Sequence, residues 1–351
     1  MNPLQQSPLA SITGRFPQVI VLVGIFTACT ASALAAESPT EQKPVPVAIP
    51  VPVAIVDTLN TLSGGPHAGF RANHAKGILV TGTFTPAQSA TSLSTAPHFA
   101  KRVPVLVRFS NATGVPTLPD ASPNASPHGI AIRFKLPDGS DTDIVSISAN
   151  GFPVATPEDF LALLQAVSLS GPNAAKPTPI EQFLGSHPAA AKFVTTPRPP
   201  PVSFGTLAYF GINAFKFTNA QGKTRFARYQ ILPMAGEHAL SDASVAKASP
   251  NYLMNELPKR IAKGAVKFRL VAQLAKEGDP VNDPTVVWPT DRELLELGII
   301  SLTSVSKNQT KEQKVVMFNP LLLPAGIEPS DDPVLLIRPA AYAVSFGQRA
   351  K

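Results

Sequence analysis

Proline is the residue that most constrains how this chain can fold. The 351 residues include 38 prolines, each of which lacks a backbone N–H donor and disfavours the interior of a helix or a central strand. We therefore expect long irregular stretches between short regular elements, and helix does not dominate throughout. With 44% hydrophobic and 15% charged residues, the chain can still form a substantial buried core.

Short runs rich in β-branched residues, separated by turn residues, predict antiparallel strands. The runs cover residues 77–84, 103–109, 129–135, 208–211, 215–217, 225–232 and 265–274. Thr156 as an N-cap before Pro157 predicts one helix, a second is predicted over residues 253–263, and residues 172–201 are predicted to be a proline-rich connection. The sequence favours an α+β fold in which eight or so antiparallel strands close into a barrel with appended helices.

The first 35 residues have the pattern of a secretory signal peptide. Arg15 precedes an apolar run over residues 19–27, and Ala33-Leu-Ala35 offers a small-x-small cleavage site. This pattern predicts export to the periplasm, and an uncleaved anchor that tethers the protein to the membrane is also compatible with it. The single cysteine lies inside this segment, so cleavage leaves no disulfide. Residues 36–53 are predicted to be a proline-rich linker, and the folded domain is expected over residues 54–351.

The chain is basic, with a formal net charge of +7. Its lysines and arginines are scattered, with no basic run and no patch interleaved with aromatic residues, so we expect no nucleic-acid partner. Positive charge of this kind suits the carboxylates of an anionic cofactor or a negatively charged membrane surface.

Two places in the sequence can carry chemistry, and each also has an ordinary structural interpretation. His74 lies just before a predicted strand, where a histidine is often a turn or surface residue. Arg338 and Tyr342 are four residues apart, which on a helix puts the guanidinium and the phenol on one face. An adjacent arginine and a ferric ion would favour the phenolate, whereas an amphipathic C-terminal helix would only pack Tyr342 against the protein. Taken singly, these residues favour the structural interpretations.

A series of motifs along the chain resembles haem catalases, and more closely the shorter catalase-related peroxidases. The motifs are Arg71-x-x-His74-Ala-Lys-Gly, Val107-Arg-Phe-Ser110, Gly129-x-Ala-x-x-Phe134, Asp143-Ile-Val, Pro157-x-x-Phe160, Val287-Trp288-Pro, Phe318-Asn-Pro, Pro324-x-Gly-Ile-Glu-Pro-Ser and Arg338-x-x-x-Tyr342. Each is unspecific alone, but all of them in the family's order are very improbable by chance. The resemblance covers residues 54–347 and implies a haem-binding, catalase-like antiparallel eight-stranded β-barrel with appended helices.

The resemblance implies the catalytic roles. Tyr342 would be the ligand of the haem iron, with Arg338 paired to its oxygen to hold it anionic. His74 would be the base that takes a proton from the peroxide and returns it to the leaving oxygen. Ser110 matches the serine that hydrogen-bonds this histidine and fixes its orientation.

The resemblance also implies which residues surround the cofactor. Arg71, Arg108 and Arg338 match arginines around the haem propionates, although Arg71 and Arg108 also suit surface ion pairs. Phe160 matches an aromatic residue that packs over the haem face, and a role in the core is equally compatible with it. Trp288 is expected in the core.

One position departs from the pattern of the family. Large catalases place an asparagine four residues after the aspartate of the Asp-Leu-Val motif, where it helps to orient peroxide, and that position here is Ile147. Asn150 lies three residues further on, and Gly151 and Pro153 would allow a local shift that brings it to the site. Without an amide beside the peroxide, we expect oxidation of a second peroxide to suffer while activation of the first continues.

The expected function is a haem peroxidase that reduces hydrogen peroxide or an organic hydroperoxide with a small organic reductant, with weak catalase activity. A homodimer is compatible with the sequence. The alternative is a non-catalytic periplasmic haem carrier, which would need Tyr342 and the arginines but not His74 with Ser110 behind it. A barrel that binds lipid or another apolar ligand would contain no haem.

Overall fold

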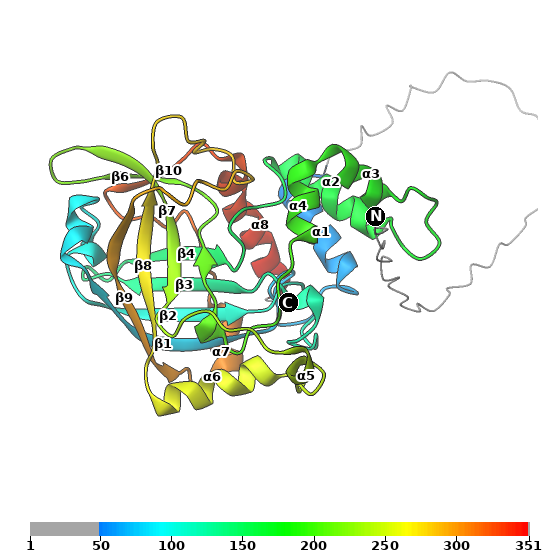
Figure 1. Cartoon of the computed structure of the whole chain (residues 1–351), viewed down its shortest axis with the longest axis horizontal. Helices are drawn as coiled ribbons and strands as arrows, with labels where there is room; N and C mark the ends of the chain where they lie inside the picture. The colour runs from blue at the N-terminus through cyan, green and yellow to red at the C-terminus, as the bar shows by residue number, and fades with distance from the viewer. Residues whose placement is uncertain (1–48, 350–351) are drawn as a thin grey trace, which may run out of the picture.

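A closed antiparallel β-barrel forms the centre of the protein (Figure 1). The computed structural model describes residues 49–349, and the barrel strands are β1 (Gly77–Pro86), β2 (Val103–Ser110), β3 (Gly129–Lys135), β4 (Asp141–Ile147), β5 (Tyr209–Phe210), β7 (Thr224–Pro233), β8 (Val266–Leu274) and β9 (Leu294–Val305). Each strand pairs with the next, and β9 pairs with β1 to close the barrel. The short strands β6 (Phe215–Thr218) and β10 (Ile327–Pro329) extend outward from β7. The predicted eight-stranded antiparallel barrel is confirmed.

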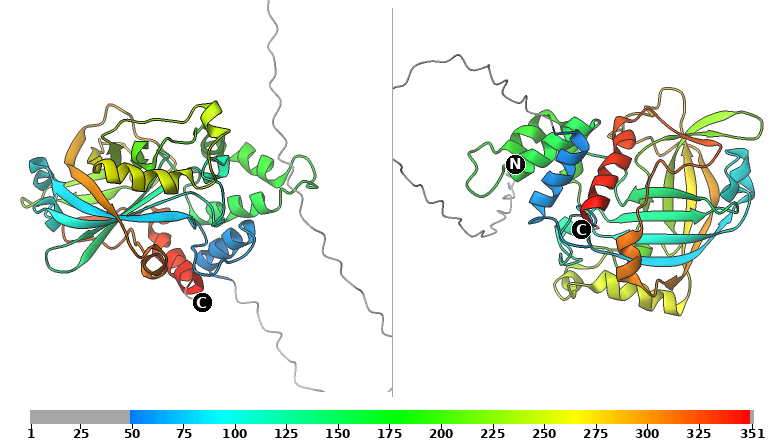
Figure 2. Two further views of the ribbon diagram at one scale, coloured as in Figure 1. Left: turned by 90° about the horizontal axis from the view of Figure 1, so that it is seen from below. Right: turned by 180° about the vertical axis from the view of Figure 1, so that it is seen from behind.

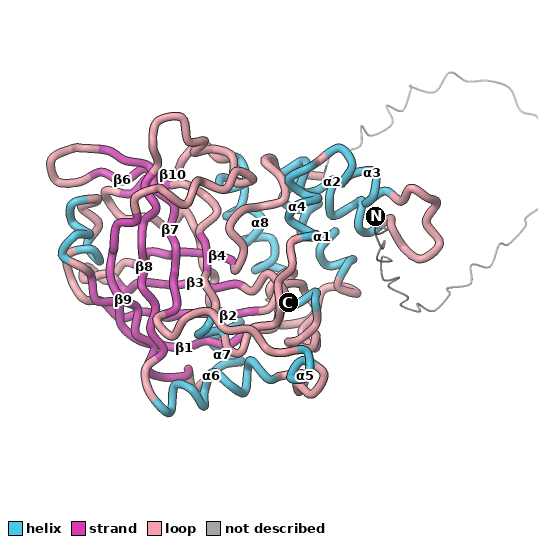
Figure 3. Tube along the Cα trace, in the orientation of Figure 1, coloured by secondary structure: helices cyan, strands magenta, loops and turns pink. Residues whose placement is uncertain are grey.

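Helices α1 to α4 and α8 lie together to one side of the barrel (Figure 3). The α-helices are α1 (Val51–Leu62), α2 (Pro157–Ser168), α3 (Pro179–Ser186), α4 (Pro188–Thr195), α5 (Asp242–Val245), α6 (Tyr252–Lys263), α7 (Gln309–Val315) and α8 (Pro333–Arg349), and the 3-10 helices are η1 (Gln88–Ser92), η2 (Pro97–Phe99), η3 (Pro123–Ala125) and η4 (Phe204–Thr206). Helix α8 lies between the barrel and α1, and it packs against α1 and α2 (Figure 2). The barrel and the helical layer therefore face each other across α8.

Prolines mark where helices begin instead of preventing them. Helices α2, α3 and α4 all start with proline, at a position where the missing N–H has no partner inside the helix anyway. Thr156 caps α2 as predicted, because its Oγ1 accepts the N–H of Asp159 at 3.1 Å. Two expectations based on proline content are wrong. Residues 172–201 contain two helices, and α1 begins at Val51, so the end of the predicted linker is helical.

Strands β4 and β9 are elements that the sequence did not reveal as strands. Strand β9 has 12 residues and Gly298 near its middle. This glycine has a φ of 150°, and a Cβ there would lie 2.4 Å from the carbonyl oxygen of Thr85, so the position excludes a side chain. The register with β8 shifts between Leu270 and Val271. The shift helps the sheet to curve, and together with the glycine it obscures the alternating pattern of a strand.

Large apolar side chains fill the barrel interior. Phe84, Phe109, Phe134 and Phe268 are fully buried, and the rings of Phe84 and Phe134 meet edge to face with centroids 5.2 Å apart. Trp288 is 1% exposed and its Nε1 donates to a carbonyl oxygen at 2.9 Å, so its predicted place in the core is confirmed. Because side chains alternate between the two faces of a strand, the other half of the strand residues point outward.

A buried histidine in the barrel predicts sensitivity to acid. The ring of His98 lies 4.9 Å from that of Phe134, and burial lowers its pKa from 6.5 to about 3. As the pH falls below 6.5, His98 therefore binds a proton in the unfolded chain but stays neutral in the folded protein. The contribution of His98 to the unfolding free energy is full above pH 6.5 and is lost as the pH drops toward 3. In urea unfolding across this window, we expect His98→Phe to reduce the pH slope of the unfolding free energy by about 1.4 kcal/mol per pH unit.

The control for this prediction is Phe134→Leu, which alters the same cluster but removes no titratable group. It should lower stability by a similar amount at each pH. An unchanged slope in His98→Phe would contradict the prediction.

Within residues 49–349, no helix combines the length and the apolar composition needed to cross a bilayer. The predicted signal peptide over residues 1–35 and the linker up to residue 48 lie outside the described residues. Export, cleavage and a membrane tether therefore stay predictions.

Candidate active site

The candidate site lies on the outer face of strands β1 to β4. Their register places Gly77, Ser110, Gly129 and Ile147 in one row across the four strands. Directly paired residues of antiparallel strands project from the same face of the sheet, and the next row, which includes Phe109, faces the barrel core. The row from Gly77 to Ile147 therefore points out of the barrel. It faces a cavity whose other walls come from α1, α2 and α8.

His74 stands beside this row and is held by the segment that follows β2. Its Nδ1 lies 2.9 Å from the carbonyl oxygen of Asn111 and 3.1 Å from Oγ of Ser110. Because a carbonyl oxygen only accepts, Nδ1 carries the proton and Nε2 keeps its lone pair. Gly129 is required here, since a Cβ would lie 2.9 Å from His74 Nδ1 and 2.7 Å from Ser110 Oγ. The predicted contact between His74 and Ser110 is present.

The surroundings of His74 keep its ring neutral. Burial, followed by the charge of Arg108, lowers its pKa from 6.5 to about 4, and the hydrogen bond to the Asn111 carbonyl partly opposes the shift. The backbone of His74 has a φ of 55°, a left-handed conformation that is uncommon for residues other than glycine and is often found at functional sites. A neutral imidazole with a free Nε2 is able to accept a proton.

Tyr342 and Arg338 lie on one face of α8, as their spacing predicts. Arg338 donates to Oη of Tyr342 from Nε at 3.1 Å and from Nη2 at 2.9 Å. Its Nη1 donates to Oδ1 of Asn213 at 2.7 Å, and Asn213 Nδ2 donates to Asp332 at 2.6 Å. Asp332 also accepts the N–H of Val334 at the start of α8. The guanidinium is thereby fixed with two N–H groups directed at the phenol oxygen.

Three arginines converge on the cavity without a carboxylate partner in residues 49–349: Arg108 and Arg349, which are buried, and Arg71, which is half-buried. Arg71 and Arg349 both donate to the carbonyl oxygen of Val316, at 2.8 and 3.1 Å, and Arg108 donates to Gln313 and to the carbonyl oxygen of Ala75. Burial and the other arginines lower the pKa of Arg108 to about 9 and that of Arg71 well below its usual value. Such a cluster stabilises an anionic group placed among the guanidiniums.

Arg349 is the member of the cluster that the sequence analysis missed. It follows Tyr342 by seven residues, or two turns of α8, so helical spacing alone puts both side chains on one face. Arg338, which we had matched to the cofactor carboxylates, is engaged by Tyr342 and Asn213. The arginines at the cavity that are free to meet an anionic group are therefore Arg71, Arg108 and Arg349, whereas the predicted set contained Arg338 in place of Arg349.

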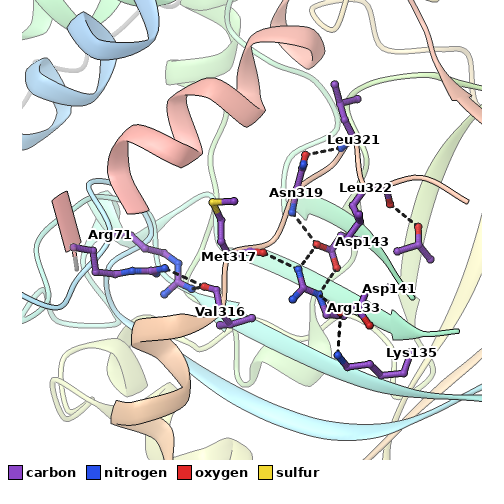
Figure 4. A network of polar contacts seen from close by, with 12 residues as sticks. Arg71, Arg133, Lys135, Asp141, Asp143, Val316, Met317, Asn319, Leu321 and Leu322 are labelled. Atoms are coloured by element: carbon purple, nitrogen blue, oxygen red, sulfur yellow. Dashed lines mark hydrogen bonds and ion pairs between the residues drawn. The ribbon is translucent and has the colours of Figure 1, made fainter. Parts of the chain in front are cut away.

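Residues 316–322, which we call the strap, cross the outer face of the barrel and position part of this cluster (Figure 4). Arg133 forms two hydrogen bonds with Asp143, at 2.8 and 2.7 Å, and donates to the carbonyl oxygen of Met317 at 2.7 Å. Asp143 accepts the N–H of Asn319 at 2.8 Å. Two strand residues thus anchor the strap, whose Val316 carbonyl meets Arg71 and Arg349.

Of the remaining predicted residues, some line the cavity and one does not. Phe160 lines the cavity beside Phe152, with ring centroids 5.2 Å apart. Ile147 also lines it, whereas Asn150 is half-buried and is not among the lining residues. The expected shift that would bring Asn150 to the site is absent, because β4 continues through Ile147 and keeps that side chain in the outward row.

Comparison with known proteins agrees with this architecture. The catalase family model matches residues 68–350. A catalase-related peroxidase of Mycolicibacterium paratuberculosis is 37% identical over 82% of this chain and 91% of its own length, and one of Synechococcus elongatus is 35% identical over 82% and 85%. Among solved structures, a fungal catalase superposes with a TM-score of 0.72 at 24% identity, covering 81% of this chain and 59% of that one. Catalase A of Saccharomyces cerevisiae gives 0.71 at 22%, covering 81% and 62%.

The closed eight-stranded antiparallel barrel with its appended helices is a catalase-like fold. The chain belongs to the catalase family. The relatives that it matches over most of their own length carry the name catalase-related peroxidase.

Proposed function

We propose that the protein is a haem peroxidase that reduces hydrogen peroxide or organic hydroperoxides with a small organic reductant and keeps only weak catalase activity. One observation carries the proposal: a single cavity combines a neutral, oriented His74 on the barrel wall with an arginine-paired Tyr342 on the helical wall. The first is suited to move a proton and the second to bind a ferric ion. The catalase-related peroxidases to which the chain is similar support the same function.

The chemistry of the cavity lining fits haem. Its walls are mostly apolar and include Val56, Phe152 and Phe160, as the flat macrocycle requires. Guanidiniums without a carboxylate partner suit the propionates, and Nε of Arg349 has no partner among the described residues. We infer that Arg71, Arg108 and Arg349 would hold the propionates and that Tyr342 would hold the iron.

The residues of this chain would perform the proton chemistry. When bound, haem would supply the iron that exchanges electrons with the peroxide and the reductant. His74 would take a proton from the peroxide on Nε2 and return it to the departing oxygen, which then leaves as water or an alcohol. Asn111 and Ser110 hold the ring so that Nε2 remains the basic atom. Arg338 would keep the oxygen of Tyr342 anionic through its two N–H groups.

Ile147 favours peroxidase over catalase chemistry and gives a test of that preference. It is the cross-strand neighbour of Gly129, which adjoins His74, and an aliphatic side chain offers no hydrogen bond to a second peroxide. We expect Ile147→Asn to raise the ratio of oxygen evolution to dye oxidation by about 10-fold, the effect of one added hydrogen bond. An oxygen electrode and dye absorbance, read on the same sample, give the ratio.

The control for this substitution is Ile147→Val, which keeps the position apolar and should leave the ratio unchanged. If the asparagine and valine variants gave the same ratio as the unaltered protein, the missing amide would not be what limits catalase activity.

The proposed function is tested by absorbance spectroscopy of the protein purified with haem supplied. We expect a haem Soret band that shifts or bleaches with hydrogen peroxide and recovers as an added dye is oxidised. A band that does not change with peroxide would favour the haem carrier. A carrier would need Tyr342 and the arginine cluster but not His74 with its hydrogen-bond partners. A protein without haem would contradict both functions. We further propose export to the periplasm, which rests on the pattern of residues 1–35.

A further inference from the structure

A buried ion pair begins two residues after His74, and neither of its members lines the cavity. Lys76 Nζ is 2.6 Å from Oδ1 of Asp120, and the two side chains are 9% and 0% exposed. The ammonium also donates to the carbonyl oxygens of Leu118 at 2.8 Å and Pro250 at 2.7 Å, so each of its hydrogens has an acceptor. Desolvating two charges is costly, and a buried pair of this kind is often no more stabilising than apolar residues would be. Its presence beside the site therefore suggests a role other than stability.

Asp120 connects this pair to Asn111. Its Oδ1 accepts from Asn111 Nδ2 at 2.8 Å, and its Oδ2 accepts the N–H of Leu253 in the first turn of α6 at 2.9 Å. At the other end of the amide, Oδ1 of Asn111 lies 3.2 Å from Nδ1 of His128. The Asn111 side chain is fully buried and engaged at both ends. This fixes the residue whose carbonyl oxygen meets Nδ1 of His74.

The contacts close into a ring. Lys76 follows His74 by two residues, and its carbonyl oxygen accepts the N–H of Asn111 at 3.0 Å. The ring therefore runs from His74 through Asn111 and Asp120 to Lys76 and back along the main chain. A residue in a left-handed conformation, as His74 is, keeps it only where the surroundings hold it in place. The ring provides that restraint.

The carbonyl of Asn111, and not the hydroxyl of Ser110, decides which nitrogen of His74 carries the proton. A serine hydroxyl both donates and accepts, so it is compatible with either tautomer, whereas a carbonyl oxygen accepts only. The charged or titratable groups that act on His74 are Arg108, Arg338 and His128. None of these is a carboxylate that could select the tautomer instead.

We propose that Lys76, Asp120 and Asn111 are positioning residues for His74, which hold the Asn111 carbonyl where it captures Nδ1–H and so keep Nε2 unprotonated toward the cavity. This inference deepens the proposed peroxidase function and rests on it for its catalytic meaning.

The primary test reads the tautomer directly and needs no turnover. Long-range ¹H–¹⁵N correlation spectra of the full chain, labelled with ¹⁵N-histidine and prepared without haem, report which ring nitrogen is protonated. We expect His74, assigned by the signals that disappear in His74→Ala, to be wholly the Nδ1–H form in the unaltered protein. In Asn111→Ala, which keeps the carbonyl but removes its anchor, we expect a mixture of the two tautomers.

A second variant and a matched control separate positioning from general destabilisation. The double variant Lys76→Met with Asp120→Asn removes both charges together, so no unpaired charge stays buried, and it should also give the mixture. The control is Arg292→Met with Asp279→Asn, an ion pair of 2.7 Å whose side chains are 14% and 6% exposed and which does not line the cavity. It should keep the single Nδ1–H form.

The haem-loaded variants give the second readout. We expect Asn111→Ala and the Lys76/Asp120 double variant to retain haem and to react with hydrogen peroxide about 10- to 100-fold more slowly, the usual cost of losing a residue that orients a functional group. Three outcomes would overturn the inference: a single Nδ1–H tautomer in both variants, a tautomer mixture in the control, or failure of both variants to fold. If the unaltered protein did not react with peroxide, the proposed function would be wrong, but the tautomer measurement would still test the positioning of His74.

Discussion

Replacing His74 with alanine is expected to leave haem binding intact and to slow the reaction with hydrogen peroxide by about 10²–10⁴-fold, the contribution of a positioned acid–base group. The side chain contributes nothing to the arginine cluster or to α8, so the cofactor contacts remain. Its removal takes away Nε2, the one nitrogen of the ring that Asn111 and Ser110 leave free. Stopped-flow absorbance of the haem band gives the rate, and haem content is measured on the same preparation.

The matched control for this substitution is His238→Ala. His238 is exposed and contacts the carbonyl oxygen of Ala235 outside the cavity, so its loss should change neither the haem content nor the rate. A His74→Ala protein that reacted as fast as the unaltered one would refute the role of His74 as base. Loss of haem from it would show that His74 supports the cofactor.

Replacing Tyr342 with phenylalanine is expected to remove most of the haem. The substitution deletes only Oη, which accepts two hydrogen bonds from Arg338, and the aromatic ring remains to pack in α8. The iron would lose its protein ligand, and the guanidinium of Arg338 would lose its partner. Gel filtration followed by the ratio of haem to protein absorbance measures the loss. Any haem that stays bound should have an altered spectrum.

Tyr252→Phe serves as the control for this second substitution. Its Oη donates to the carbonyl oxygen of Pro201 at 2.7 Å, and neither residue lines the cavity, so this variant should keep a full complement of haem. A Tyr342→Phe protein with tightly bound haem and an unaltered spectrum would exclude Tyr342 as the ligand.

The parts of the fold that could be predicted are those in which local pattern and final structure agree. The runs at residues 77–84, 103–109 and 129–135 are strands, as their β-branched residues and flanking turns predict. Burial alternates along most of β3, whereas β1 is buried on both faces at Leu79 because Val316 and Phe318 of the strap cover its outer side. Strand β9 could not be predicted, since Gly298 and the shifted register with β8 interrupt its alternation. The first turn of α1, residues 51–53, falls in the predicted linker because Pro50 and Pro52 suggest extended chain, yet both prolines lie at the helix start, where proline is tolerated.

The part of the candidate site that could be predicted is the part that local spacing and motifs describe. Arg338 and Tyr342 are one helical turn apart, so their contact follows from spacing alone, and the motifs around His74 and Ser110 indicated a pair of residues that the register of β1 and β2 brings together. The place of Asn150 was wrong, because a strand holds Ile147 in the row that faces the cavity. Gly151 and Pro153 allow several backbone geometries after β4. Local sequence therefore does not tell which side chain of this segment reaches the site.

By itself, the sequence determined most of the local elements, the order of the motifs and the chemistry that each residue brings. Only the tertiary structure decided which arginines meet at the cavity, that the strap positions them, and that Asn111, Asp120 and Lys76 close a ring behind His74. These are contacts between residues far apart in the chain, and their geometry depends on barrel closure and strand register, which no local window of the sequence contains. Tautomer and pKa follow from burial and neighbours, so they too are properties of the folded protein.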